Sequence, residues 1–254
     1  MRLDEKLSIK RQKLLSIFAT AGFPKLDSLP SILDAVDQNG VDILEVGIPY
    51  SDPISDGPII QNSNSIALKN GITLELIFDQ LKSYPSSVPK VMMGYFNSVL
   101  QFGIERFCIA CNDSGISGVI LPDLPPEIYL KEYAVLFKQN NLSNIFLITP
   151  ETSKARIQWI DKNSTTFIYA VSSSGTTGKK QGIKASLPFL KRLNQIQLDH
   201  PVLIGFNIKR AADFSLAARY TNGGIIGSAF IQQLAHSENI PHSVKQFVSQ
   251  IIKN

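Results

Sequence analysis

Three carboxylates, Glu45, Asp52 and Asp56, lie within one short stretch of the sequence. Glu45 belongs to the apolar run 41–46, where loss of hydration would raise the pKa of its carboxyl and suit it to proton transfer near neutral pH. Asp52 and Asp56 follow among Pro and Gly residues that end the run. The alternative is structural, because Glu45 could pair with a Lys or Arg and the two Asp residues could form turns. Residue types alone leave both interpretations open.

Other groups of residues that could carry chemistry are incomplete. Cys108 and Cys111 form a C-x-x-C, but no second Cys pair or nearby His completes a zinc site, so we expect two buried apolar residues. The histidines fall late in the chain and are not clustered, at His200, His236 and His242. The sequence therefore argues against a metal centre and against a Ser/His triad.

The elements that must position these carboxylates alternate along the chain between strand-like and helix-like segments. Such alternation is typical of parallel strands joined by crossover helices. We expect strands at 14–20, 41–46, 90–93, 118–121, 145–148, 166–171, 201–204 and 224–226. We expect an amphipathic opening helix within 1–13 and helices at 29–39, 74–83, 104–112, from 126, 154–160, 185–194, 211–219 and 242–252. Eight units suit a closed barrel, although six would suit an open doubly wound sheet, and counting does not separate them.

Length and composition limit the class of protein. The chain has 254 residues, 44% of them hydrophobic, and a net charge of +4. A (β/α)8 barrel needs about 250 residues and no segment resembles a linker, so we expect one domain spanning 1–254. No apolar run approaches the ~20 residues of a membrane span, and 1–13 lacks the features of a secretory signal, so we expect a cytoplasmic protein without membrane contact. The modest, dispersed charge argues against nucleic-acid binding.

Two of the loops after expected strands are long, at 48–71 and 172–184. Long loops beside a site commonly act as lids or partner surfaces. The second of them contains 173–178, a run of Ser, Gly and Thr whose N–H groups and hydroxyls could hold a phosphate. A flexible linker of small polar residues would have the same composition.

The loops after the expected seventh and eighth strands contain 205–208 and 227–229. Barrels commonly bind phosphate in these two loops, where unpaired N–H groups at a helix start favour an anion. Gly227 would let the backbone approach the phosphate closely, and Ser228 would add a hydroxyl and cap the helix. The order of the two loops therefore favours phosphate binding over simple helix capping.

The carboxylate stretch, LEVGIPYSDPISDGPIIQ, resembles the motif of the tryptophan synthase alpha subunit family. The similarity spans consecutive positions with several Gly and Pro residues and extends along the chain from Phe18 to Ser228. It implies a (β/α)8 TIM barrel with an extra N-terminal helix. It also implies retro-aldol cleavage of indole-3-glycerol phosphate to indole and glyceraldehyde 3-phosphate, with Glu45 and Asp56 as the catalytic residues.

The resemblance further implies a substrate site made of aromatic residues around the indole, a mobile sixth loop and the phosphate loops. The corresponding residues are Phe18, Tyr169, Thr177, Gly178, Phe206, Asn207, Gly227 and Ser228. Tyr169 matches a tyrosine that helps orient the catalytic Glu, and Thr177 matches one that contacts the catalytic Asp. Family members usually have Gly where this chain has Asn207, the non-Gly residue type that best tolerates positive φ. Tyr95 matches a position near the partner-facing rim.

The resemblance implies no metal and no organic cofactor in this chain, and pyridoxal phosphate only in a partner beta chain. The expected assembly is an alpha2beta2 heterotetramer, a beta dimer flanked by two alpha chains. Two alternatives remain open: a free-standing indole-3-glycerol phosphate lyase, and a catalytically weak barrel that acts as an allosteric partner of the beta chain. High activity without a partner would favour the first.

Overall fold

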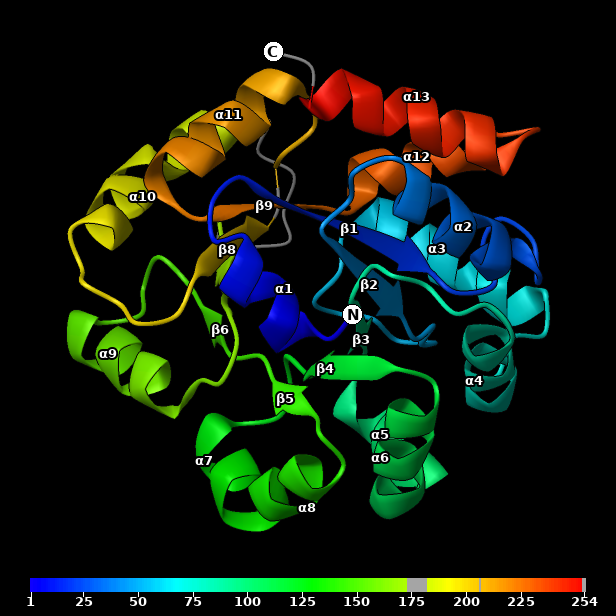
Figure 1. Cartoon of the computed structure of the whole chain (residues 1–254), viewed down its shortest axis with the longest axis horizontal. Helices are drawn as coiled ribbons and strands as arrows, with labels where there is room; N and C mark the ends of the chain where they lie inside the picture. Colours follow the sequence, from blue (N-terminus) through cyan, green and yellow to red (C-terminus); the bar gives the residue numbers. More distant parts are fainter. Residues whose placement is uncertain (173–181, 206, 253–254) are drawn as a thin grey trace.

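The structure, a computed structural model, describes residues 1–172, 182–205 and 207–252. In this part of the chain nine parallel strands form one sheet, with helices around it (Figure 1). The strands are β1 (Leu14–Thr20), β2 (Ile43–Gly47), β3 (Lys90–Met93), β4 (Ile116–Ile120), β5 (Ser143–Asn144), β6 (Leu147–Ile148), β7 (Ile168–Val171), β8 (Val202–Gly205) and β9 (Gly223–Ile226).

Most helices lie outside the sheet, whereas α1 lies across one end of it (Figure 1). The helices are α1 (Leu3–Ile9), α2 (Ser28–Gln38), α3 (Pro58–Lys69), α4 (Leu74–Ser83), α5 (Phe96–Phe102), α6 (Ile104–Asp113), α7 (Pro126–Ile128), α8 (Ala134–Gln139), α9 (Lys154–Asn163), α10 (Leu187–Asn194), α11 (Ala211–Tyr220), α12 (Ser228–Ala235) and α13 (Ile240–Ile252). A π-helical turn, Tyr129–Tyr133, joins α7 to α8, and a 3₁₀ turn, Ile183–Ser186, precedes α10. Within the described ranges, no helix combines the length and apolar character that a membrane crossing needs.

The sheet closes into a barrel where β5 and β6 meet. These strands are the two ends of the strand order, yet only Ile145 and Phe146 separate them in the chain. Ile145 N donates to Val119 O on β4 at 2.9 Å, and Tyr169 N on β7 donates to Phe146 O at 2.9 Å. β5 and β6 are therefore halves of one broken strand. The predicted (β/α)8 barrel with an N-terminal helix is confirmed.

Alternate residues of each strand face the barrel interior, as the two-residue period of a strand requires. On β2, Ile43 belongs to the interior cluster, whereas Leu44 and Val46 belong to the larger core under the outer helices. Glu45, between them, therefore faces the interior. The interior cluster consists of Leu3, Leu7, Leu14, Ile43, Val91, Ile120, Ile145, Phe167, Tyr169, Leu203 and Ile225. Since α1 contributes two of its members, this helix closes the end of the barrel at which the strands begin.

Asp42 attaches α1 to this closed end. Its carboxylate lies 2.9 Å from Lys6 Nζ and 2.5 Å from Lys10 Nζ. The same side chain accepts a hydrogen bond from Leu15 N at 2.9 Å. Both carboxylate oxygens are thus paired with cations or a backbone donor, which allows the acid to be buried at low cost.

The segment 48–71, predicted as one long loop, is not a loop throughout, because α3 occupies its second half. Gly57 is the extended N-cap residue and Pro58 is the first helical residue, where its fixed φ suits a helix start. The buried residues of this helix are Ser63, Asn64 and Ala67. A buried face of small and polar residues gives no strong hydrophobic period, so the sequence pattern did not indicate the helix.

A second helix, α5, is also absent from the sequence prediction. Phe96 N, in its first turn, donates to both carboxylate oxygens of Asp123, at 2.9 and 3.0 Å. Asp123 follows β4, so the capping group comes from a segment that is distant in sequence. A local reading of residues 94–103 therefore lacks the signal that starts this helix.

Candidate active site

Glu45 lies in the barrel interior and is inaccessible to solvent. Ser16 Oγ, on the neighbouring strand β1, donates a hydrogen bond of 2.7 Å to Glu45 Oε1. Within the described residues, Glu45 Oε2 is buried and has no hydrogen-bond partner. Burial raises the pKa of the Glu45 carboxyl to about 7, although the Ser16 hydrogen bond acts in the opposite direction. Glu45 is therefore an acid that exchanges its proton near neutral pH.

Asp56 lies in the loop between β2 and α3, held by Tyr95 from the loop after β3. Tyr95 Oη donates to Asp56 Oδ2 at 3.3 Å and accepts a hydrogen bond from Ser55 N at 3.0 Å. Burial raises the pKa of the Asp56 carboxyl to about 6, and the Tyr95 hydrogen bond partly offsets this. Asp52 differs, because it is exposed and accepts a hydrogen bond from Ser51 Oγ at 2.6 Å. Of the two loop carboxylates, Asp56 is thus the one that is partly buried.

Tyr169 on β7 faces both acids across the barrel interior. Its side chain is buried, and burial raises the pKa of its hydroxyl well above 10, with further contributions from the negative charges of Glu45 and Asp56. Both carboxylates thus act electrostatically on this one hydroxyl. A side chain at Gly205 on β8 would collide with the Tyr169 hydroxyl, so glycine there leaves room for the ring. The two predicted acids and the predicted tyrosine thus converge on one volume.

Phe18 on β1 lies beside Glu45, since the two residues are partners in the β1–β2 register. A side chain at Gly47 would collide with the Phe18 ring. A Cβ at Gly227 would come within 3.5 Å of Phe18 Cβ and 3.6 Å of Ile60 Cδ1. The aromatic ring therefore fills the space between the carboxyl ends of β2 and β9, at the edge of the same volume.

The predicted phosphate-binding residues are partly described. Asn207 has a positive φ of 60°, as its residue type allows, and its Nδ2 donates to Ser172 Oγ at 3.4 Å. The expectation that Ser228 caps α12 is wrong, because Gly227 is the N-cap residue and Ser228 is the first helical residue. The helix begins one residue earlier than a Ser228 cap would allow, because Gly227 O already accepts a helical hydrogen bond from Ile231 N at 3.0 Å. The start of α12 still offers N–H groups without intrahelical partners.

Three predicted site residues, Thr177, Gly178 and Phe206, lie outside the described residues. One residue that contacts a predicted acid, Ser16, was not singled out from the sequence. The sequence contained one indication of this role. Ser16 is a hydroxyl residue in a mostly apolar strand, at a position whose side chain the two-residue strand period directs into the barrel. The resemblance matches Tyr95 to a position near the partner-facing rim and lid, whereas its hydroxyl contacts Asp56.

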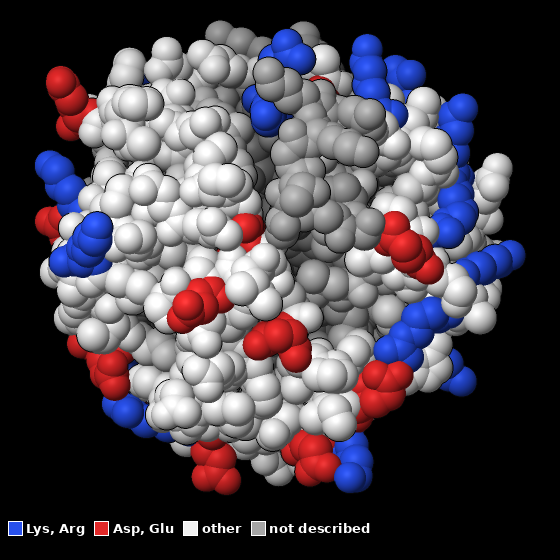
Figure 2. Space-filling model, turned by 180° about the vertical axis from the view of Figure 1, so that it is seen from behind, with Lys and Arg blue, Asp and Glu red and all other residues white. Residues whose placement is uncertain are grey.

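The face opposite α1 carries the mouth of the barrel, to which the strands direct their carboxyl ends. Figure 2 shows this face, where Asp and Glu side chains lie around the middle and most Lys and Arg side chains lie toward the edge. Among the described residues, no group of three or more His, Cys, Asp or Glu side chains is arranged to hold a metal ion.

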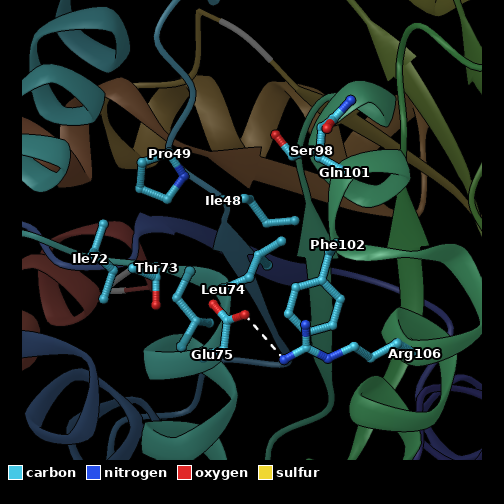
Figure 3. A pocket seen from close by; sticks show the side chains of 11 residues that line it. Ile48, Pro49, Ile72, Thr73, Leu74, Glu75, Ser98, Gln101, Phe102 and Arg106 are labelled. Carbon is cyan, nitrogen blue, oxygen red and sulfur yellow. Dashed lines mark hydrogen bonds and ion pairs between the residues drawn. The ribbon is translucent and has the colours of Figure 1, made fainter.

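A cavity of about 300 Å³ lies outside the barrel wall, between the start of α4 and helices α5 and α6 (Figure 3). Its lining combines Ile48 and Pro49, which follow β2, with a Glu75–Arg106 ion pair of 3.1 Å. Arg106 also stacks over the Phe102 ring, 4.0 Å from its centroid. Both charged side chains are mostly exposed, whereas the barrel interior holds buried acids of raised pKa. The barrel mouth is therefore the better candidate for catalysis.

Comparison with known proteins places this geometry in a family context. The family model described as "Tryptophan synthase alpha chain" matches residues 5–253. The tryptophan synthase alpha chain of Flavobacterium psychrophilum is 45% identical over 253 residues, covering 98% of this chain and 99% of that one. The one from Christiangramia forsetii is 46% identical over 253 residues, with 98% of each chain covered. A solved tryptophan synthase A-subunit from Pyrococcus furiosus is 32% identical, with a TM-score of 0.85, covering 96% of this chain and 99% of that chain.

Proposed function

The chain belongs to the tryptophan synthase alpha chain family, and on this basis we propose that Glu45 and Asp56 are its catalytic acids. The enzyme is a lyase of tryptophan biosynthesis that cleaves indole-3-glycerol phosphate to indole and glyceraldehyde 3-phosphate. The observation that supports the assignment most strongly is the buried carboxyl of Glu45, which has one oxygen without a partner among the described residues.

The reaction needs two proton transfers and one electrostatic contact. A proton must be added at indole C3, which breaks the aromaticity of the ring and leaves positive charge shared with the ring nitrogen. The glycerol hydroxyl next to that carbon must lose its proton, so that its electrons form the aldehyde carbonyl while the C–C bond breaks. The bonding electrons then return to the ring and restore indole.

Glu45 is suited to both proton transfers. A group whose pKa lies near 7 is protonated often enough to act as an acid and ionised often enough to act as a base. In our proposal Glu45 donates its proton to C3 and then accepts the hydroxyl proton, so it ends the cycle in its starting state. No further proton carrier is required.

Asp56 is suited to stabilise the charge on the ring nitrogen. Its carboxylate, held by Tyr95, would accept the indole N–H and favour the cationic ring that C3 protonation creates. The negative charges of both acids act on the Tyr169 hydroxyl. We assign Tyr169 the role of orienting the ring and Glu45, and Phe18 a packing role against the indole.

The phosphate would anchor the other end of the substrate. We propose that Asn207, Gly227 and Ser228 hold it through backbone N–H groups at the start of α12 and in the loop after β8. Their binding energy would orient the bond to be broken over Glu45. On family resemblance we also retain Thr177, Gly178 and Phe206 as substrate-binding residues.

The beta chain of tryptophan synthase is the protein partner that family membership implies. We propose an alpha2beta2 heterotetramer in the cytoplasm, in which pyridoxal phosphate is bound by the beta chain and this chain works without an organic cofactor or metal. We also propose that residues 1–254 form one domain, because a single sheet contains strands from Leu14 to Ile226.

Indole release from indole-3-glycerol phosphate tests the proposal. Purified chain would be assayed alone and with its cognate beta chain, beside Asp56→Asn and an Asp52→Asn control that alters a nearby exposed carboxylate. We expect turnover to rise with the beta chain and to fall at least about a hundredfold in Asp56→Asn, because a preorganised electrostatic contact is lost. Equal rates in Asp56→Asn and Asp52→Asn would remove Asp56 from the mechanism. High turnover without the beta chain would indicate a free-standing lyase.

A further inference from the structure

Ser16 is the only hydrogen-bond partner of the Glu45 carboxyl within the described residues. The 2.7 Å bond joins two side chains that are both inaccessible to solvent. In the same part of the chain, Ser16 Oγ bonds to no other group. Its hydroxyl hydrogen is thus committed to Glu45 Oε1.

Strand register defines the side from which Ser16 approaches. Ser16 is the register partner of Ile43, whereas Glu45 is the register partner of Phe18. Ser16 therefore lies one pleat nearer the α1 end of the barrel than Glu45 does. Its hydroxyl reaches Oε1 from the closed end, and Oε2 is the oxygen that stays available to a ligand entering through the mouth.

We propose that Ser16 is a positioning residue for Glu45, which occupies Oε1 and thereby keeps the transferable proton on Oε2. In a neutral carboxylic acid, the oxygen that accepts a hydrogen bond is the carbonyl oxygen and the other carries the proton. The hydroxyl of Ser16 imposes this choice because it donates to Oε1. The inference rests on the proposed role of Glu45 as the proton carrier.

The same hydrogen bond stabilises the ionised carboxylate. Burial alone raises the pKa of Glu45, and the Ser16 hydroxyl lowers it toward neutrality. Among the described residues, the other titratable groups that face this volume are Tyr169 on β7 and Asp56 in the loop after β2. The interior neighbours on β3, β4, β8 and β9 are apolar, namely Val91, Ile120, Leu203 and Ile225. Ser16 is therefore the main described group that opposes the desolvation of Glu45.

Ser16→Ala removes the hydroxyl and little else. In the alpha chain bound to its cognate beta chain, we expect kcat for indole release at pH 7 to fall about tenfold, because a hydrogen bond to a charged group is lost. KM should stay within about twofold, since the bond is not made to substrate. The apparent pKa in the pH profile of kcat should rise by about one pH unit. Ser16→Thr keeps the hydroxyl, so its kcat and its apparent pKa should both stay close to the wild-type values.

A spectroscopic measurement separates this role from a general packing role. The infrared carbonyl band of the neutral Glu45 carboxyl, identified as the band lost in Glu45→Gln, would be followed against pH without substrate. The intensity of this band falls as the carboxyl ionises, and the pH at the midpoint of that fall should be higher in Ser16→Ala than in wild type. The matched control is Ser117→Ala, which removes another buried serine hydroxyl, one on β4 that accepts from Leu3 N at 3.2 Å and is not bonded to Glu45. That variant should leave the midpoint unchanged.

The outcomes distinguish this inference from the proposed function. If Glu45→Gln is inactive while Ser16→Ala has the wild-type pH profile and band midpoint, the positioning role of Ser16 is wrong and the role of Glu45 stands. If Glu45→Gln turns over normally, the proposed function fails first. Should Ser16→Ala fail to fold, Ser16→Cys keeps the volume but donates weakly, and the same upward shift is expected from it. An unshifted midpoint in Ser16→Cys would refute the inference equally.

Discussion

Asp42 and Glu45 are buried acids of one short segment, yet their surroundings differ. Asp42, at the α1 end of the barrel, is bound by two lysine ammonium groups and a backbone N–H. Glu45, the interior acid of β2, is bound by one hydroxyl, and its second oxygen has no partner within the described residues. One acid is thus neutralised by its neighbours, and the other is not.

The difference follows the two ends of a barrel. Residues at the closed end hold the strands and the N-terminal helix together, whereas the carboxyl ends of the strands form the site. A buried acid without a cation keeps its proton to higher pH and weakens the fold when it ionises. Glu45 therefore lowers stability in return for reactivity, and Asp42 contributes to stability only. This contrast predicts opposite effects for matched amide substitutions.

Glu45→Gln should have the largest effect on activity. We expect turnover to fall about a thousandfold or more, because the amide cannot donate or accept the transferred proton. The fold should persist, since Gln has nearly the same shape and can still accept the Ser16 hydrogen bond. Steady-state indole release and circular dichroism measure the two properties. Asp42→Asn is the comparison variant, and its folded molecules should retain most of their turnover.

The pH dependence of stability should differ between wild type and Glu45→Gln. The ordinary carboxyl pKa of Glu is 4.5, and that of folded Glu45 is about 7. Between these values the unfolded chain has lost the proton that the folded chain keeps, so raising the pH favours unfolding. A gap of about 2.5 pH units corresponds to about 3 kcal/mol of lost unfolding free energy above pH 7. Glu45→Gln should avoid this loss.

Urea unfolding of both proteins from pH 5 to pH 8 measures the effect. Asp56 is present in both, so its own raised pKa cancels in the difference. The stability of Glu45→Gln relative to wild type should grow as pH rises from 5 to about 7 and level off above that pH. A difference that does not change with pH would mean that the Glu45 carboxyl ionises as it does in the unfolded chain.

Asp42→Asn should lower stability and leave chemistry intact. The change leaves Lys6 and Lys10 without a counter-charge and weakens the bond to Leu15 N. We expect the free energy of unfolding to fall by about 2 kcal/mol, the value for lost hydrogen bonds to a charged group. Urea unfolding at pH 7 measures it, with Asp34→Asn, a change at an exposed residue of α2, as control. A decrease no larger than that of the control would show that Asp42 does not anchor α1.

The sequence predicted the alternating strands and helices because almost every element leaves a periodic signal, and the family resemblance favoured a barrel over an open sheet. It missed α3 because the fully buried residues of that helix are Ser63, Asn64 and Ala67, which carry no strong hydrophobic period. It missed α5 because the cap on Phe96 comes from Asp123, a residue beyond the next strand. Local patterns therefore fail where a helix is specified by contacts between distant segments.

The site shows the same division. Glu45 was predictable because a charged residue interrupts an apolar strand, and Asp56 because of the motif around it. The partner of each acid was not, since Ser16 on β1 and Tyr95 after β3 reach the acids only through strand register and loop packing. Residue identity indicates which groups can react, and tertiary structure decides which neighbours adjust their pKa.

Tyr95→Phe should have the smallest effect of these changes when each is expressed as a free energy. It extends the comparison to the second acid, Asp56. It removes a hydroxyl that donates to Asp56 Oδ2 and accepts from Ser55 N, so the loop carboxylate loses its fixed position. Packing should survive because the ring still stacks on Tyr50, with centroids 4.9 Å apart. We expect kcat for indole release to fall about tenfold, the equivalent of one hydrogen bond to a charged group. Tyr50→Phe removes the hydroxyl of the stacked partner, which bonds only to Asn97 Nδ2 in the described residues, and should stay near wild type. If the two variants lose the same activity, ring packing rather than the Tyr95 hydroxyl holds Asp56 in place.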